Sequence, residues 1–170
     1  FQNCNLIEDE ECENVAVFGG DHVYMFDVAQ METHHRDVDA DLTIAAFRVP
    51  IEEATQFGVI QVDVDGRVVG FQEKPKDPMP MPGRPDIALV SMGNYLFKTD
   101  GRLRALREDA YAVNTKHDFG RDVIPKMVAD GKRVFIYDFD HNHIDGAADN
   151  VAPYWRDVGT LDSYFDANLD

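Results

Sequence analysis

The sequence predicts an α/β fold with a mixed sheet, mostly parallel with an antiparallel part, and flanking helices. Two observations support this. Short apolar runs alternate with segments of helical spacing along the 170 residues. Two alternating runs are also joined by Asp65-Gly66, which predicts an inserted β-hairpin because glycine accepts a positive φ. The length suits one domain, and no apolar run reaches the 18 residues of a transmembrane helix.

The first half of the chain is expected to hold four strands and one helix. A strand at 15–20 ends in glycines, and residues 27–38 have the Met and Val spacing of a helix. Residues 41–49 are apolar and β-branched, which favours a buried strand. The hairpin strands are expected at 56–62 and 67–73.

The second half opens with five prolines in residues 74–90, which favour an ordered loop without regular structure. Asp118 and Thr160 are suited to cap helices that follow them, and Gly131 to end one. The remaining predicted elements are strands at 91–97 and 133–139, and helices at 100–109, 119–130 and 161–169.

Acidic residues dominate the charge. Asp and Glu number 32 against 16 Lys and Arg, giving a net charge of −16. Such a surface repels phosphates, so we expect neither a nucleic-acid nor a membrane partner. The excess of Asp over Lys suits either salt adaptation or an ordinary acidic bacterial protein. Cys4 and Cys12 fit no redox or zinc motif, so we expect free thiols in a reducing cytoplasm.

Two short motifs that follow predicted strands carry candidate functional residues. In GGDH at 19–22, glycines allow close approach of a ligand, and Asp21 is a candidate metal ligand. A simple turn would explain the same pattern. In EKP at 73–75, Lys74 is placed to offer a point charge to a phosphate, although the pattern alone favours a solvated surface lysine.

Three further motifs are less specific. In SMGNY at 91–95, small residues and Tyr95 would accept a ring, as would an ordinary crowded strand. In HDFG at 117–120, helix capping by Asp118 is a complete explanation. YWRDVGT at 154–160 combines two aromatic residues, Arg and Asp before a helix, a composition more typical of a site than of a core.

Taken together and in this order, the motifs resemble the ADP-glucose pyrophosphorylases, the glucose-1-phosphate adenylyltransferases. That resemblance implies a Rossmann-like nucleotidyltransferase fold. It also implies synthesis of ADP-glucose and pyrophosphate from ATP and glucose 1-phosphate, with Mg²⁺, for bacterial glycogen synthesis. The matching stretches are VFGGDHVYMFD, DLTIAAFRVPIEEATQFGVIQVD, GFQEKPKDP, ALVSMGNYLF, HDFGRDVIPK and PYWRDVGTLDSYFDANLD.

The resemblance also implies roles for individual residues. Asp21 matches the catalytic, metal-binding Asp of the family, and Asp157 matches its second metal ligand. Glu73 and Lys74 match the sugar-phosphate contacts, with catalytic Lys74 on the phosphate. The residues that match the lining of the glucose 1-phosphate pocket are Ser91, Tyr95, Asp118, Phe119 and Trp155.

The sequence also departs from the family pattern. It shows neither the N-terminal βαβ unit, whose Gly-rich, Arg-containing loop cradles ATP, nor the C-terminal left-handed β-helix. We therefore expect 1–170 to be the sugar-phosphate half of a catalytic domain, weakly active or inactive alone and prone to self-association. The parent is expected to be a homotetramer. Met25 stands where relatives commonly carry a basic residue, and Arg121 stands where they commonly carry Lys.

Two alternatives remain at this point. The chain could be a non-catalytic, truncated paralogue that binds a sugar phosphate or a partner subunit. Retention of Asp21, Lys74 and Asp157 together argues against this, because a chain freed from catalysis need not keep all three. A related pyrophosphorylase using another nucleotide or sugar is the second alternative.

Overall fold

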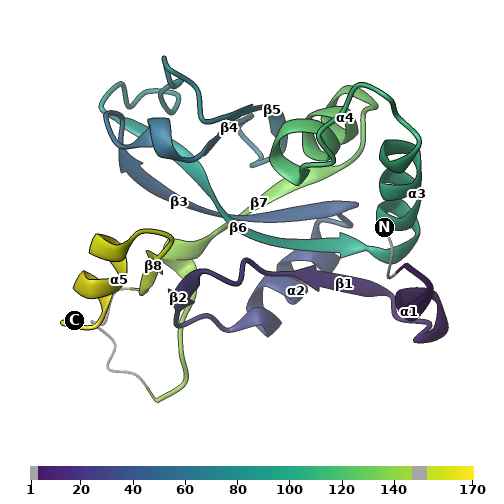
Figure 1. The fold of residues 1–170 in the computed structure, drawn as a ribbon, viewed down its shortest axis with the longest axis horizontal. Coiled ribbons are helices and arrows are strands. Elements are labelled where there is room, and N and C mark those ends of the chain that lie inside the picture. The colour runs from purple at the N-terminus through teal and green to yellow at the C-terminus, as the bar shows by residue number, and fades with distance from the viewer. Residues whose placement is uncertain (1–3, 147–152) are drawn as a thin grey trace.

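A six-stranded mixed sheet forms the body of the protein. The computed structural model describes residues 4–146 and 153–170, and its sheet has the order β5-β4-β6-β3-β7, with β1 also paired to β6 (Figure 1). Strand β6 is central and contacts β3 along one edge, while β4 and β1 pair with different parts of the other. The strands are β1 (Asn14–Val17), β3 (Leu42–Pro50), β4 (Gly58–Val62), β5 (Val68–Glu73), β6 (Ile87–Lys98) and β7 (Val134–Asp138).

The mixed sheet and its inserted hairpin are confirmed, but the expectation of a mostly parallel sheet is wrong. Among the described strands, β3 and β7 are parallel, and the other pairings are antiparallel. The cause is the direction of β6, which runs against β1, β3 and β4 alike. The short β4–β5 turn also permits only antiparallel pairing.

Helices cover both faces of the sheet. Helix α2 packs through Met31 on one face, and α4 packs through Ile124 and Met127 on the other (Figure 1). The helices are α1 (Cys4–Asp9), α2 (Val28–Asp37), α3 (Thr99–Ala110), α4 (Ile124–Ala129) and α5 (Leu161–Ala167), with short helical turns at Ala54–Gln56, Phe119–Val123 and Phe139–His141.

Strand β3 divides the core into two layers because successive side chains point to opposite faces. Leu42 and Ile44 join the cluster beneath α4, whereas Ala45 joins the cluster beneath α2. These side chains are fully buried, so β3 is covered on both faces. The cluster beneath α2 also includes Trp155, which links the core to the C-terminal segment.

Local signals predicted most elements correctly. Gly66 has φ +78° in the hairpin turn, and Gly131 has φ +73° just beyond α4. Thr160 forms a capping box with Ser163 at the start of α5. Asp118 accepts a hydrogen bond from Arg121 N (2.8 Å), but the helix predicted at 119–130 begins with a π-helical turn.

Three short elements were missed, and one strand is longer than expected. The sequence reading missed α1 and the two-stranded sheet of β2 (His22–Tyr24) and β8 (Trp155–Asp157). Three residues carry too little periodicity to show a strand, so only the distant partner defines it. Strand β6 begins at Ile87 rather than 91, because Ile87–Val90 pair with the C-terminal half of β3.

Strand β6 contains a wide bulge. Ile44 of β3 pairs with Tyr95 and Ala46 pairs with Ser91, so Ala45 alone faces Met92–Asn94. Gly93, in the middle of this bulge, has φ +74°, a left-handed conformation that favours glycine. The bulge therefore bends β6 where the sequence showed only an apolar strand.

Two earlier expectations concern thiols and membranes. Cys12 is a free thiol, as expected, while the side chain of Cys4 lies outside the described part. Within residues 4–146 and 153–170, none of the helices has the length and apolar character that crossing a bilayer requires.

Replacing Asn94 with Leu is expected to stabilise the protein. Asn94 is fully buried in the bulge, and neither its amide nitrogen nor its oxygen has a hydrogen-bond partner among the described residues. Burying an unpartnered amide costs free energy, so an apolar side chain of similar shape should raise the free energy of unfolding by about 1 kcal/mol. Urea unfolding would measure this. A lower midpoint for N94L than for wild type would show that the amide has a partner, such as an internal water.

Candidate functional site

A cavity of about 210 Å³ is lined by residues of β2, β4, β5, β6 and β8 and of the loops beside them. It gathers residues from segments that are far apart in the sequence, which only the folded sheet brings together. Seven of the nine predicted site residues line it: Asp21, Glu73, Lys74, Ser91, Tyr95, Trp155 and Asp157. Asp118 and Phe119 lie beside the cavity rather than in its wall.

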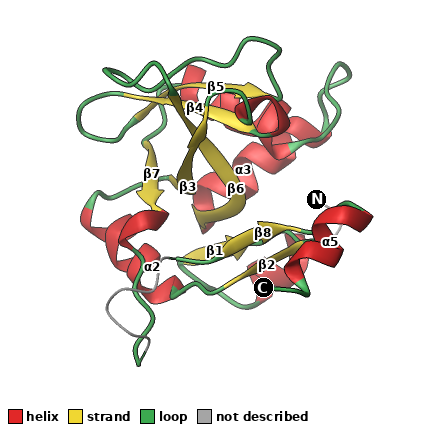
Figure 2. Cartoon of the chain, turned by 90° about the vertical axis from the view of Figure 1, so that its left-hand side faces the viewer, coloured by secondary structure: helices red, strands yellow, loops and turns green. Residues whose placement is uncertain are grey.

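The pairing of β2 with β8 places the two predicted metal-binding carboxylates together. Strands β2 and β8 lie side by side (Figure 2). His22 pairs with Asp157, and Val158 N donates to Asp21 O (2.9 Å). A Cβ on Gly159 would lie 3.0 Å from Asp157 Oδ1 and 3.6 Å from Asp21 Oδ2. Both carboxylates therefore border the same small space, although they are 136 positions apart in the sequence.

Glu73 lies at the mouth of the cavity between two glycines. A Cβ on Gly120 would be 2.5 Å from Glu73 Oε2, and one on Gly58 would be 3.1 Å from the same atom. Any side chain at Gly120 would displace the carboxylate. Partial burial, followed by repulsion from Asp118, raises the pKa of Glu73.

Lys74 is held in an unusual backbone conformation. Its φ is +45°, a left-handed value that is rare for a residue other than glycine, and its backbone N donates to Phe57 O (3.0 Å). Backbone strain of this kind is concentrated at functional sites. Among the described residues that line the cavity, Lys74 is the only Lys or Arg.

The bulge in β6 brings Ser91 and Tyr95 together in the cavity wall. Ser91 Oγ accepts from Gly93 N (3.1 Å) and donates to Tyr95 Oη (3.4 Å). Burial raises the pKa of the Tyr95 hydroxyl, so it stays protonated at neutral pH and can act as a donor or an acceptor. Phe119 stacks on the Tyr95 ring with a centroid distance of 5.9 Å, which fixes the ring from behind.

Trp155, Phe57 and His22 form an aromatic wall of the cavity. The Trp155 ring lies 4.8 Å from Phe47, 6.0 Å from Phe57 and 5.1 Å from His22 between ring centroids. Phe47 and Phe57 anchor the indole to β3 and to the start of β4. The wall gives one side of the cavity an apolar surface of the kind that packs against a sugar ring.

The charge of the cavity suits a metal ion. Asp21, Glu73 and Asp157 outnumber Lys74, so a phosphate would be repelled without a further cation. No group of three or more His, Cys, Asp and Glu in the described residues is arranged as a complete metal site. Mg²⁺ commonly takes one or two protein carboxylates and completes its shell with water and phosphate oxygens. Asp21 and Asp157 fit such a partial site.

Comparison with known proteins decides the family. A nucleotidyl transferase family model matches residues 1–170. The chain belongs to the nucleotidyl transferase family. Members of such families generally use a divalent metal, which agrees with the carboxylate pair of the cavity.

Curated relatives are similar over the whole chain. The glucose-1-phosphate adenylyltransferase of Thermus thermophilus is 50% identical over 170 residues. The glucose-1-phosphate adenylyltransferases of Vibrio vulnificus and of an Anaeromyxobacter species are each 52% identical, over 170 and 171 residues. Each comparison covers 100% of this chain and 41% of the relative, so the chain spans less than half the length of these proteins.

The sequence analysis missed several residues of the candidate site. His22 and Phe57 line the cavity, and Gly58, Gly120 and Gly159 make room for its carboxylates. The available signal was the position of two of these glycines. Gly58 lies near the start of a predicted strand, and Gly120 directly follows Asp118 and Phe119 at a predicted helix cap. The sequence could not show which side chain would fill each space.

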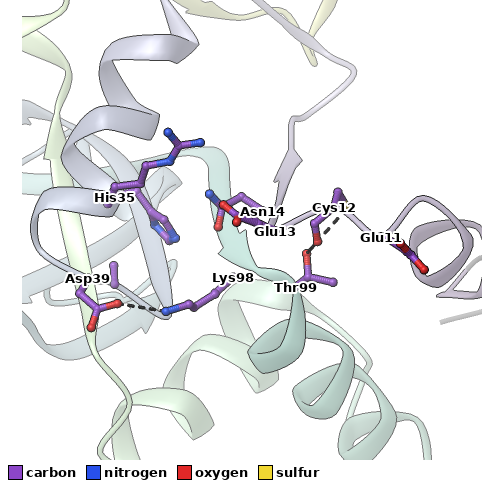
Figure 3. Close-up of a pocket in the computed structure, with 10 residues that line it drawn as sticks. Glu11, Cys12, Glu13, Asn14, His35, Asp39, Lys98 and Thr99 are labelled. Atoms are coloured by element: carbon purple, nitrogen blue, oxygen red, sulfur yellow. Dashed lines mark hydrogen bonds and ion pairs between the residues drawn. The ribbon is translucent and has the colours of Figure 1, made fainter.

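A larger cavity of about 520 Å³ lies at the other end of β1, bordered by Asn14, His35 and Lys98 (Figure 3). It contains none of the predicted site residues. Lys98 Nζ pairs with Asp39 Oδ1 (3.0 Å), and buried His35 bonds through Nδ1 to Thr43 Oγ1 (2.7 Å). Burial lowers the pKa of His35, so this imidazole is neutral at pH 7. The larger cavity is therefore not the one that gathers the predicted site residues.

The raised pKa of Glu73 predicts a pH-dependent effect of Glu73→Gln on stability. The ordinary pKa is 4.5, and the folded value lies above it. The folded state thus favours the protonated carboxyl, and the corresponding stability is complete below pH 4.5 and is lost as pH rises through the raised pKa. E73Q should therefore be slightly more stable than wild type at pH 7, by about half a kcal/mol or less because water screens the carboxylate.

Urea unfolding of both proteins at pH 4 and pH 7 measures this effect. The two unfolding curves should converge at pH 4. A stability gain that is equal at both pH values would contradict a charge effect at Glu73.

Proposed function

We propose that this chain binds glucose 1-phosphate and supplies the metal-binding carboxylates of an enzyme that makes ADP-glucose and pyrophosphate from ATP. The observation that carries the proposal is one cavity that combines a carboxylate pair, a single lysine and an aromatic wall in a nucleotidyl transferase domain. The names of its relatives, glucose-1-phosphate adenylyltransferases at about half identity, support this substrate. Because the chain spans 41% of them, the activity of the whole protein is part of the proposal.

The arrangement suits in-line attack by a sugar phosphate on a nucleotide α-phosphorus. The attacking phosphate oxygen is already an anion, so the reaction needs no protein nucleophile and no strong base. Lys74 would bind this phosphate and fix its position, which turns a two-body collision into a positioned attack. Its restrained backbone supports that role, because the peptide is fixed to Phe57 O.

Charge balance assigns a role to the two aspartates. Asp21 and Asp157 would hold Mg²⁺, the metal we propose for this site. When bound, the ion neutralises phosphate charge and stabilises the charge that develops on the transferred phosphate. Gly159 borders both carboxylates and has no side chain, so it would leave room for the ion and for phosphate oxygens.

The remaining residues would recognise the sugar. The Glu73 carboxylate and the hydroxyls of Ser91 and Tyr95 would form hydrogen bonds with glucose hydroxyls. The Trp155 ring would provide an apolar surface for the sugar. Phe119 would act by supporting the Tyr95 ring. We propose that Asp118 acts indirectly as well, since its carboxylate caps the helical turn that places Phe119.

The proposal extends to the organisation of the protein. We propose that 1–170 forms the sugar-phosphate half of a catalytic domain and that the ATP phosphates are bound by a segment outside it. A homotetrameric parent is proposed on resemblance alone. Free Cys12 supports a reducing compartment, and we propose the cytoplasm.

Replacing Lys74 with Ala is expected to weaken glucose 1-phosphate binding about 10- to 100-fold. A hydrogen bond from a charged group contributes about 1.5–3 kcal/mol, which corresponds to that range. Trp155 is the only tryptophan and lines the cavity, so its fluorescence reports binding. The titration uses glucose 1-phosphate with Mg²⁺, and glucose 6-phosphate as the specificity control.

Lys76→Ala is the matched control, because Lys76 is an exposed lysine two positions along the same loop and does not line the cavity. Its dissociation constant should equal that of wild type. Saturable binding that K74A and K76A weaken equally would mean that lysine charge acts nonspecifically. No fluorescence change with folded wild-type protein would overturn the proposed ligand.

The 170 residues alone are expected to bind the sugar phosphate without turnover. Incubation with ATP, glucose 1-phosphate and Mg²⁺ should release no pyrophosphate above a control with the Asp21→Asn variant. Pyrophosphate release by wild type that D21N abolishes would show that these residues also bind ATP productively. That result would overturn the proposed division of the catalytic domain.

A further inference from the structure

We propose that His22 is a positioning residue that holds Asp21 in place for metal binding, an inference that rests on the proposed function. The imidazole is almost buried, with its side chain 12% exposed, and its Nε2 lies 3.4 Å from Asp21 Oδ1. Asp21 itself is far more exposed, with 65% of its side chain accessible. An exposed aspartate samples several rotamers, so a fixed neighbour is needed to restrict it.

The imidazole fills a space that two glycines leave open. A Cβ on Gly19 would lie 2.7 Å from His22 Cε1, and a Cβ on Gly93 would lie 2.9 Å from the same atom. Gly19 follows β1, and Gly93 is the left-handed residue of the β6 bulge. The segment after β1 and the bulge of β6 therefore leave space for this one ring, and the ring packs between them.

The same ring joins the third segment of the site. The Trp155 ring packs against it edge to face, with 5.1 Å between centroids. Asp157, the proposed second metal ligand, is the pairing partner of His22 in the β2–β8 sheet. The His22 side chain thus contacts the carboxylate of Asp21, and the His22 backbone is paired with Asp157, which carries the other proposed metal ligand.

Packing alone does not explain why a histidine fills the space between Gly19 and Gly93. Nδ1 is buried and has no hydrogen-bond partner among the described residues, which is unfavourable for a polar atom. An apolar ring would fill the space without that penalty. The imidazole differs from such a ring in presenting Nε2 to Asp21, and this contact is what the inference assigns as its role.

Two amide variants separate the two ring nitrogens. In His22→Gln the amide nitrogen extends as far from the backbone as Nε2, whereas in His22→Asn it reaches only the place of Nδ1. The probe is Tb³⁺, which binds carboxylate oxygens and luminesces when Trp155 is excited at a wavelength that tyrosine does not absorb. Asp157→Asn identifies the part of the signal that comes from this site.

We expect H22N to raise the half-saturating Tb³⁺ concentration about 10-fold and H22Q to stay within about 2-fold of wild type. Glucose 1-phosphate affinity at saturating Mg²⁺ should fall much less than Tb³⁺ affinity in H22N, because saturation with the metal compensates for its weaker binding. A merely structural role would weaken both ligands together. Equal Tb³⁺ affinity for H22N, H22Q and wild type would overturn the inference, as would parallel loss of both ligands in folded H22N.

Gly19→Ala tests whether the position of the imidazole matters, without changing the histidine itself. Its methyl group would displace the imidazole, so G19A should weaken Tb³⁺ binding about as much as H22N does. In the double variant G19A/H22N the effects should not add, because the displaced ring is already absent. Additive effects would overturn the inference. This cycle also decides the question if H22Q proves unstable.

The same titrations distinguish a failure of the proposed function from a failure of the role proposed for His22. Wild type that binds neither glucose 1-phosphate nor Tb³⁺ in a D157N-sensitive manner contradicts the proposed function itself. Wild type that binds both, with H22N unaffected, contradicts only the role of His22.

Discussion

The bulge of β6 is the constraint on which the candidate site depends. Opposite the single residue Ala45, β6 accommodates Met92–Asn94, and this is possible because Gly93 adopts a left-handed conformation. In a regular strand, residues four apart lie roughly 13 Å from each other, too far for a hydrogen bond. The bulge brings the Ser91 and Tyr95 hydroxyls to 3.4 Å and leaves room for His22 over Gly93.

A second constraint is the crossing of two distant segments in the small β2–β8 sheet. Three residues on each side form it, and α5 follows directly after the Gly-Thr turn. The sheet is too small to be stable by itself, so it depends on Trp155 packing into the core beneath α2. The relative position of Asp21 and Asp157 is thus stabilised by hydrophobic burial of Trp155, which also belongs to the aromatic wall of the cavity.

Predictability differed between elements for physical reasons. The hairpin turn at Gly66 and the caps at Asp118 and Thr160 were predicted because their signals are local. Outside the hairpin, the parallel or antiparallel direction of the strands was not, because it depends on which distant strand lies beside each one. Among the residues that line the cavity, Asp21, Lys74 and Asp157 were predicted through resemblance of whole motifs. His22 was missed because the role that we propose for it arises from the two glycines around it.

The sequence by itself determined the α/β class, the family to which the motifs belong, and the types of residue available for the chemistry. These follow from short-range patterns of hydrophobicity, turn residues and motif order, which do not require knowledge of distances. Tertiary structure alone decided that Asp21 and Asp157 border the space at Gly159, that Glu73 is confined by Gly58 and Gly120, and that one lysine faces three carboxylates. Each of these depends on contacts between residues far apart in the chain, and such contacts exist only once the sheet has formed.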